Sequence, residues 1–365
     1  MTTFSDTAHS HIPNLPLYEP GRPLEEVSRE FGFEAATADK LASNENALGP
    51  SPLALEAIRQ HASRMHLYPD GAAFDLTRAL AGKLDISPES IIAANGSNEI
   101  IELLGHVFLG PGTNVVMGER AFVVYRLVAN LFQADVISVP MPDHVHDLCG
   151  QARALTPQTR LVYVANPNNP TGTVVDPEAL HAFVRGLPDH VVAVLDEAYI
   201  ELLPKRLQPD VLRYVREGRR VVIMRTFSKT YGLAGLRIGY AVAPPDLIQL
   251  LQRVRQPFNV NAMAQAAAIA ALGDEEHVER TRELVQSGLA RFQDAFEDLG
   301  LPYIPSVANF ICVEVGAGRS TFEKLQARGI IVRPMDVYGM PRHIRITVGL
   351  PEQNERCLAA LEECL

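Results

Sequence analysis

The sequence has no tryptophan, only four cysteines, and no apolar run close to the ~20 residues needed to cross a membrane. The cysteines, at positions 149, 312, 357 and 364, form no CxxC pair, which argues against a zinc knuckle or a thioredoxin-type redox motif. Isolated cysteines are typical of proteins in a reducing compartment. The N-terminal residues also lack the apolar core of a signal peptide. We therefore expect a cytoplasmic protein with no membrane partner.

Positive charge is also scarce, since 33 lysines and arginines face 43 aspartates and glutamates and leave a net charge of −10. This balance disfavours nucleic-acid binding, which needs clustered cations against phosphate. The sequence has no GxGxxG after its first expected strand and no GxxxxGK[ST], so neither a dinucleotide site nor a P-loop is indicated. The histidines of "HSH" and "HVH" lack flanking ligands, and we expect no metal site.

Apolar sequence is abundant, at 47% of the residues against 21% charged, which allows a large core. Short Val/Ile-rich runs alternate with helix-like segments up to Pro257. This alternation predicts an α/β protein whose mostly parallel central sheet has helices on both faces. Beyond Pro257 the pattern changes to helices followed by separate strands. We expect an N-terminal arm with part of the small domain at 1–45, a large domain at 46–257 and a smaller C-terminal α+β domain at 258–365.

Unusual polar residues follow four of the expected strands. In open α/β sheets, ligands bind at the carboxyl ends of the strands, so we expect these residues to surround one site. One such coincidence would carry little weight, whereas four indicate a function. The residues are Gly96, Ser97 and Asn98 after "SIIAA", the segment "NPNNPTG" after "RLVYVA", Asp196 and Tyr199 at the end of "VVAVLD", and Ser228 and Lys229 after "RVVIMRTF".

Lys229 lies in "RTFSKTYGLAGLRIG", among hydroxyl residues and glycines that follow a buried strand. Most lysines are solvated surface charges, but these neighbours indicate a side chain directed into the protein. A desolvated lysine loses its proton more readily and can act as a nucleophile or form a Schiff base. Lys229 is therefore the candidate reactive residue.

Asp196 ends a run of apolar residues, so its carboxylate needs a cationic partner or hydrogen bonds. A helix cap or an internal ion pair would meet that need. The protonated ring nitrogen of pyridoxal 5'-phosphate (PLP) would meet it as well. Tyr199 could bind the phenolic oxygen of that ring or could be packed in the core. A guanidinium, hydroxyls and backbone N–H groups at an expected helix N-terminus suit the cofactor phosphate, and they come from Arg237, Thr226, Ser228 and the turn 96–98.

The motifs "NPNNPTG", "LDEAYIE", "TFSKTYGLAGLRIGY" and "IRITVG", in this order and spacing, resemble those of the fold-type I, class I and II PLP-dependent aminotransferases. The resemblance covers nearly the whole chain, from "YEPGRP" onward, and "SNENALGPSP" is similar to a motif of the subfamily that acts on histidinol phosphate. It implies transamination between L-histidinol phosphate and 2-oxoglutarate in histidine biosynthesis, by a homodimer with shared active sites.

The resemblance also implies roles for the residues at matching positions. Lys229 would hold PLP as a Schiff base and then move the proton between the substrate Cα and the cofactor. Asp196 would keep the pyridine nitrogen protonated. The other cofactor contacts would be Tyr199 and Asn169 at the phenolic oxygen, Phe122 on the ring face, Gly96, Ser97, Asn98, Thr226, Ser228 and Arg237 at the phosphate, and Tyr68 at the phosphate of the neighbouring subunit.

For the substrates, Arg345 matches the arginine that binds a carboxylate, Arg333 a second substrate arginine and Tyr18 a lid tyrosine. A guanidinium binds carboxylate and phosphate equally well in a bidentate geometry, which suits substrates of both kinds. Arg333 could instead form a surface ion pair. Three departures from the family pattern leave the amino donor less defined than the reaction, namely Phe122 for tyrosine, Ala47 for proline and Asn98 for aspartate.

Other activities also fit these residues. An aminotransferase for phenylalanine or tyrosine would use the same scaffold, and so would a decarboxylase of a phosphorylated amino acid. Outside the enzymes, an aminotransferase-like sensing domain of a transcription regulator is conceivable, but it would need a DNA-binding module. The arm of about 45 residues is proline-rich and not basic, which disfavours that module.

Overall fold

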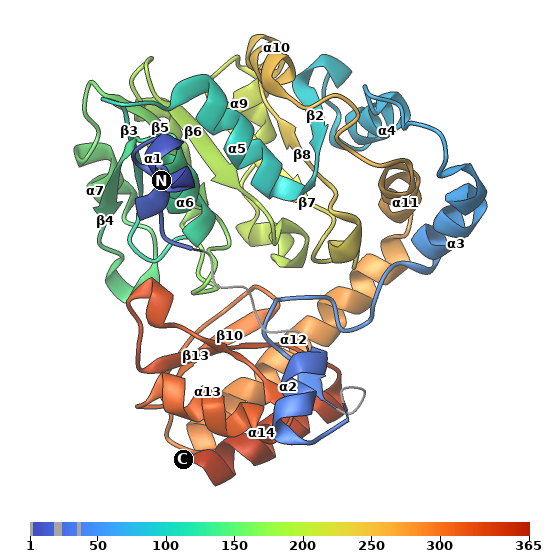
Figure 1. Cartoon of the computed structure of the whole chain (residues 1–365), viewed down its shortest axis with the longest axis vertical. Coiled ribbons are helices and arrows are strands. Elements are labelled where there is room, and N and C mark those ends of the chain that lie inside the picture. The colour runs from blue at the N-terminus through green and yellow to red at the C-terminus, as the bar shows by residue number, and fades with distance from the viewer. Residues whose placement is uncertain (1–2, 18–23, 35–37) are drawn as a thin grey trace.

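A seven-stranded sheet forms the centre of the larger part of the molecule in this computed structural model, which describes residues 3–17, 24–34 and 38–365 (Figure 1). Its strand order is β2-β8-β7-β6-β5-β3-β4. The strands are β2 (Ile91–Ala94), β3 (Asn114–Gly118), β4 (Asp135–Val139), β5 (Thr159–Ala165), β6 (Val192–Asp196), β7 (Val221–Thr226) and β8 (Gly239–Val242).

The sheet is parallel apart from one strand, as the alternating pattern predicts. Only β8 runs the other way, and it pairs antiparallel with both β2 and β7. The connection from β7 to β8, residues 227–238, contains one short 3-10 helix and no α-helix, so it does not carry the chain back across the sheet as a parallel crossover would. This short connection contains Lys229, so the reversal places the lysine directly at the end of β7.

Helices cover both faces of this sheet, which explains why its strands are apolar at consecutive positions. In β6, Ala193 and Leu195 pack with α3, α4, α8 and α11 on one face. Val192 and Val194 pack with α5, α6 and α10 on the other face. The helices are α3 (Pro52–His61), α4 (Phe74–Leu84), α5 (Gly96–Phe108), α6 (Val123–Leu131), α7 (Leu148–Arg153), α8 (Pro177–Gly186), α9 (Leu212–Arg216), α10 (Pro245–Val254) and α11 (Ala262–Leu272).

The smaller part of the molecule lies at the far end of the long helix α12 (Glu275–Asp298), coloured orange in Figure 1. Its antiparallel sheet has the order β12-β13-β10-β9, and β1 pairs with β11 beside it. The segment "IIVRPM" is divided between β11 and β12. Its elements are α2 (Leu24–Phe31), β1 (Asp39–Lys40), β9 (Tyr303–Ile304), β10 (Phe310–Glu314), α13 (Gly318–Gln326), β11 (Ile330–Ile331), β12 (Arg333–Pro334), β13 (His343–Thr347) and α14 (Pro351–Cys364). Helix α1 (Phe4–Thr7) lies against the larger part instead, near α6, and His11 after it contacts the Leu131 oxygen at 3.1 Å (Figure 1).

The expected domain boundary after residue 257 remains a prediction, and the packing of α11 and α12 suggests where to place it. Ala264 and Val278 belong to the same apolar core as the seven-stranded sheet. Val285 and Phe292, further along α12, pack in the core of the smaller part. We therefore propose a boundary inside α12 rather than after residue 257. The contribution of the first 45 residues to the smaller part is supported by the pairing of β1 with β11.

The described residues can also be compared with the expectations about membrane spans and cysteines. Within residues 3–17, 24–34 and 38–365, no helix combines the length and apolar character that a bilayer span requires. The four cysteines are free thiols, and all but Cys149 are buried. Their burial suits a packing role, since a buried thiol behaves as a small apolar side chain.

Candidate active site

A cavity of about 380 Å³ lies at the carboxyl ends of the parallel strands. Residues from all four of the expected strand ends line it, which confirms that these segments converge. Ten of the predicted site residues form part of its wall, and they are Ser97, Asn98, Phe122, Asn169, Asp196, Tyr199, Thr226, Ser228, Lys229 and Arg237. Their individual roles stay predictions, which the contacts below support.

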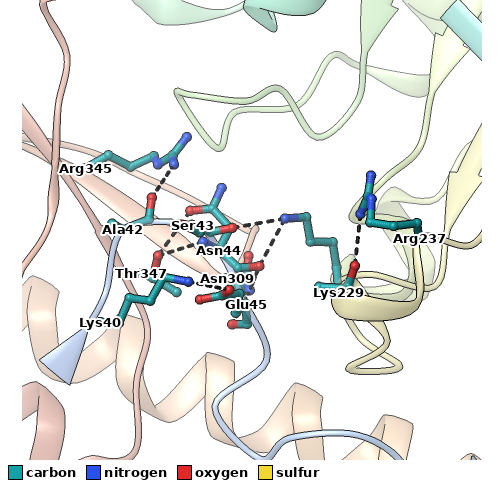
Figure 2. A network of polar contacts seen from close by, with 11 residues as sticks. Lys40, Ala42, Ser43, Asn44, Glu45, Lys229, Arg237, Asn309, Arg345 and Thr347 are labelled. Atoms are coloured by element: carbon teal, nitrogen blue, oxygen red, sulfur yellow. Dashed lines mark hydrogen bonds and ion pairs between the residues drawn. The ribbon is translucent and has the colours of Figure 1, made fainter. Parts of the chain in front are cut away.

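Lys229 extends from the β7–β8 connection toward the segment that precedes α3 (Figure 2). Its Nζ donates to the backbone oxygens of Ser43 and Asn44, each at 3.2 Å. Loss of surrounding water lowers the pKa of Lys229 to about 8, and the positive charges of Arg345 and Arg237 act in the same direction. A lysine with this pKa is partly neutral near physiological pH, which is the form that acts as a nucleophile or base.

The turn after Lys229 depends on a glycine at position 232. Its φ of +70° lies in the left-handed region that side chains disfavour. A Cβ there would also lie 2.1 Å from the backbone oxygen of Gly49. The close approach of these two backbone segments brings the residues before α3 next to the lysine.

Asp196, at the end of β6, is buried and bound by two donors. The hydroxyl of Tyr125 donates to Oδ2 at 2.6 Å, and the N–H of Ala198 donates to Oδ1 at 3.1 Å. Burial raises the pKa of Asp196, while both hydrogen bonds and the charge of Lys229 lower it. These donors favour the carboxylate form, which is the form that a protonated ring nitrogen would need.

Tyr125 is a functional candidate that the sequence interpretation missed. Its ring stacks on Tyr163 at 4.3 Å between centroids, and both side chains are buried. A signal was available, because Tyr125 follows Phe122 by three residues at the start of α6. Residues three apart on a helix share a face, so a side chain beside the predicted ring-stacking residue could have been inferred.

Tyr199 and Asn44 form a second buried pair. The amide Nδ2 of Asn44 donates to the hydroxyl oxygen of Tyr199 at 2.9 Å. Burial raises the pKa of Tyr199 to about 12, while Arg345 and this hydrogen bond oppose the rise. The tyrosine is therefore a neutral phenol at physiological pH. Asn44 belongs to the "SNEN" motif, but its role could not be inferred because its partners are distant in the sequence.

The predicted phosphate contacts gather at the N-terminus of α5. Ser97 and Asn98 lie in the first turn of this helix, whose free N–H groups attract anions. Across the cavity, the Thr226 hydroxyl donates to Ser228 Oγ at 3.0 Å. The cluster of hydroxyls, helix N–H groups and guanidinium is suited to a phosphate.

Gly96 allows the guanidinium of Arg237 to approach this turn. Its φ is +71°, and a Cβ on it would lie 2.9 Å from the Arg237 Nη2 atom. Gly96 therefore does not line the cavity itself. Its lack of a side chain leaves room for the guanidinium of Arg237 beside the first turn of α5.

Arg345, on β13, comes next to the cavity from the smaller part of the molecule. It is 6% exposed, and its guanidinium donates to Asn169 Oδ1 at 2.5 Å and to the Ala42 oxygen at 2.9 Å. Among the described residues its Nε has no hydrogen-bond partner, and no carboxylate is paired with it. A buried cation without an anionic partner is unfavourable, so an anionic ligand beside Arg345 would stabilise the site.

Arg333, on β12, lies directly opposite Arg345 in the antiparallel pairing of β12 with β13. Directly opposed residues present their side chains on the same face of a sheet. The two arginines expected to bind substrate therefore share one face, although they are twelve positions apart in the chain.

The remaining predicted residues lie elsewhere. Tyr68 is outside the cavity wall and 83% exposed, with its ring stacked on Phe258 at 4.9 Å. This position is compatible with the expected contact to a neighbouring subunit and excludes a role in the wall of its own cavity. Tyr18 lies outside the described residues.

Comparison with known proteins agrees with this geometry. The family model for "Aminotransferase class I and II" matches residues 39–361. The histidinol-phosphate aminotransferase of Akkermansia muciniphila is 47% identical over 359 residues, which cover 98% of each chain. That of Moorella thermoacetica is also 47% identical, over 97% of this chain and 92% of the relative.

Solved structures agree as well. The histidinol-phosphate aminotransferase of Sinorhizobium meliloti, in complex with pyridoxal-5'-phosphate, is similar with a TM-score of 0.90 and 32% identity, over 97% of this chain and 96% of that one. The aspartate aminotransferase of Thermus thermophilus with maleate has a TM-score of 0.83 at 23% identity, over 98% and 99% of the chains, and so shares the fold.

Proposed function

The chain belongs to the aminotransferase class I and II family, and on this premise we propose that it transfers the amino group of L-histidinol phosphate to 2-oxoglutarate with PLP as its cofactor. The observation that carries the proposal is the arrangement of one cavity, in which a lysine of lowered pKa, a buried carboxylate and an anion site surround the same space. The 47% identity to histidinol-phosphate aminotransferases over nearly the whole chain supports the donor.

The residues around the cavity fit PLP at each of its polar groups. The hydroxyls of Thr226 and Ser228 and the turn at 96–98 suit the phosphate, and Asp196 suits a protonated ring nitrogen. Tyr199 and Asn169 remain as candidates for the phenolic oxygen. When bound, PLP supplies an aldehyde that reacts with an amine and a protonated ring that accepts the electrons of the bond broken at Cα.

The protein supplies the proton transfers and the charges. We infer that Lys229 would hold the cofactor through its amine and that, when free, the same amine would move a proton at the substrate Cα as a general base and acid. Its pKa of about 8 is close to the operating pH, which suits both directions of transfer. Asp196 stays ionised through its bond to Tyr125 and holds the proton on the ring nitrogen.

The two arginines suit the two halves of the reaction. Histidinol phosphate carries a phosphate but no carboxylate, whereas glutamate and 2-oxoglutarate carry two carboxylates. We propose that Arg345 binds the carboxylate next to the reacting carbon. Arg333, on the same face of the small sheet, binds the second anionic group, whether phosphate or carboxylate.

We further propose a cytoplasmic homodimer in which each subunit completes the site of the other. Tyr68, at 83% exposed, stacks on the exposed Phe258, and further large apolar side chains are exposed in the chain segments on either side of Tyr68. Exposed apolar side chains that gather on one surface favour a protein interface. The exposed residues in question are Leu53, Met65, Leu67, Phe74 and Phe258.

The test is the visible spectrum of the purified protein during one half-reaction. Addition of L-histidinol phosphate without a 2-oxo acid should remove the band of lysine-bound PLP, and 2-oxoglutarate should restore it. A band that persists with histidinol phosphate and disappears with phenylalanine would favour the aromatic aminotransferase. Release of carbon dioxide with no need for a 2-oxo acid would favour a decarboxylase. A protein without any PLP band would contradict the whole proposal.

A further inference from the structure

The segment 42–45 forms a bridge between the substrate arginine and the lysine (Figure 2). At one end, Arg345 donates to the Ala42 oxygen at 2.9 Å. At the other, Lys229 donates to the oxygens of residues 43 and 44. Asn309 directly precedes β10, and its side-chain Nδ2 donates to the backbone oxygens of Asn44 and Glu45 at 3.0 and 3.2 Å. The backbone of the segment is thus held in place by both parts of the molecule.

The side chain of Asn44 has its own fixed orientation. Asn44 is 1% exposed, and its backbone N–H donates to Thr347 Oγ1 at 3.0 Å. The hydroxyl of Thr347 in turn donates to Asn44 Oδ1 at 3.2 Å. If the amide were reversed, its nitrogen would face Thr347, and the Thr347 hydroxyl would lose its only acceptor among the described residues. The threonine therefore directs the amide nitrogen away from β13, toward Tyr199.

The amide nitrogen then determines where the proton of Tyr199 can lie. Nδ2 donates to the Tyr199 oxygen at 2.9 Å, so the hydroxyl proton cannot occupy that side of the oxygen. Among the described residues, no other side chain or backbone group binds this hydroxyl, and Tyr199 lines the cavity. The remaining direction for the proton is into the cavity.

We propose that Asn44 is a positioning residue that turns the hydroxyl proton of Tyr199 into the cavity, so that the tyrosine donates to the phenolic oxygen of PLP instead of accepting from it. The inference rests on the proposed binding of PLP. It adds a function for the side chain of Asn44 in the "SNEN" segment, which acts on the chemistry through Tyr199.

Asn44→Asp is the matched substitution for a test. Aspartate has the same shape and tolerates the φ of +55° at this position, but an ionised carboxylate can only accept hydrogen bonds. It would draw the Tyr199 proton to itself and away from the cavity. A donor to the phenolic oxygen favours the unprotonated linkage between Lys229 and PLP, so its loss should raise the pKa of that linkage.

The measurement is a titration of the visible PLP band against pH in the absence of substrate. We expect Asn44→Asp to raise the pKa of the linkage by about one to two units, the value of one hydrogen bond to a charged group. The new carboxylate also acts on Lys229 through its charge, and this part of the shift persists when Tyr199 is replaced by phenylalanine. The part lost in the Tyr199→Phe background measures the effect through the hydroxyl.

Asn309→Ala is the structural control, because it removes two anchors of the segment and leaves the Asn44–Tyr199 bond intact. If Asn44→Asp shifts the pKa of the linkage equally in the wild-type and in the Tyr199→Phe background, the inference is overturned. It is also overturned if Asn309→Ala alone gives the same shift as Asn44→Asp. If Asn44→Asp does not fold, Thr347→Val replaces it, since it frees the amide to reverse. No shift for that variant would overturn the inference, and a shift that depends on Tyr199 would support it.

The same titration separates this inference from the proposed function. A wild-type protein with no PLP band would overturn the proposed function and the inference with it. If the wild-type protein shows a PLP band that changes with pH, and the band of the Asn44→Asp variant changes at the same pH, the inference alone is overturned.

Discussion

The chemistry of the cavity depends on single side chains whose surroundings change their ordinary behaviour. Lys229 is the clearest case, since its pKa is lowered to about 8 mainly by loss of water around the ammonium group. Asp196 is the opposite case, because burial raises its pKa while Tyr125 and Ala198 hold it in the charged form. The shift of Lys229 favours the neutral amine, whereas Asp196 depends on its two hydrogen bonds and on the charge of Lys229 to remain a carboxylate in spite of its burial.

The lowered pKa of Lys229 predicts the pH dependence of PLP attachment to the protein freed of cofactor. Only the neutral amine reacts, and its fraction rises with pH until the pKa is passed. The attachment rate should therefore rise up to pH about 8 and then level off, whereas an exposed lysine would continue to gain up to about 10.4. Stopped-flow absorbance measures the rate. Lys229→Ala should show no attachment, and a rate still rising at pH 9 would contradict the prediction.

Gly96→Ala should weaken PLP binding without unfolding the protein. The added Cβ meets Nη2 of Arg237 at 2.9 Å, and the φ of +71° strains any side chain. If strain of about 1–3 kcal/mol is relieved by displacing the phosphate site, the affinity for PLP falls by roughly 5- to 150-fold. Fluorescence titration gives the affinity. Gly82→Ala is the control, because a Cβ there meets nothing within 4 Å, and equal affinities for both variants would contradict the assignment.

At the scale of elements, the site is assembled from the ends of strands and the starts of helices. Ser51 illustrates how the N-termini of two helices that are distant in the sequence, α3 and α12, are joined. Its Oγ accepts from the N–H of Ala54 as the N-cap of α3. The same hydroxyl donates at 2.5 Å to Asp274, which is the N-cap of α12. The helix leading to the smaller part is thereby tied to the segment next to Lys229.

Ser51→Ala should therefore destabilise the protein more than the loss of an ordinary cap. One N-cap contributes about 1 kcal/mol, and the buried bond to a carboxylate about as much again. A decrease of about 2 kcal/mol in the free energy of unfolding is expected, measured by urea denaturation at fixed protein concentration. Ser87→Ala removes an exposed cap whose bond is 3.4 Å long, and it should cost less. Equal losses for the two variants would contradict the coupling of α3 to α12.

At the scale of the whole molecule, the cavity lies between two parts that meet only when the chain is folded. Lys229 and Asp196 belong to the seven-stranded sheet and its connections, while Arg345 belongs to the small antiparallel sheet. Asn169 links them through its bond to Arg345. A change in the relative position of the two parts would thus alter the distance between the substrate arginine and the lysine.

The proposed homodimer predicts recovery of activity in mixed dimers. Lys229→Ala and Tyr68→Ala should each be nearly inactive alone, because every site then lacks one of its residues. In a mixed dimer, the site with an intact Lys229 receives Tyr68 from the Lys229→Ala subunit and is complete. Activity should appear when the two variants are unfolded and refolded together. No recovery, with mixed dimers shown by native mass spectrometry, would place Tyr68 in the site of its own chain or outside both.

Local patterns account for what could be predicted of the fold. Val/Ile-rich runs such as β6 can be identified because both faces of the strand are buried, so consecutive positions are apolar. The reversal of β8 was not predicted, since it depends on a connection without a crossover helix rather than on the strand itself. The boundary that we propose inside α12 also has no local signal, because the helix continues without interruption from one apolar core into the other.

The sequence by itself was sufficient to predict the candidate lysine, the buried aspartate and the candidate phosphate residues, because these residues follow strands that a local apolar pattern identifies. The arginine pair was predicted from the resemblance to the family. Only the tertiary structure decided which side chains orient them. Asn44 meets Tyr199 across 155 positions and Thr347 across 303, and Tyr125 meets Asp196 across 71. Such contacts have no local signature, because they depend on how the packed elements bring remote segments together.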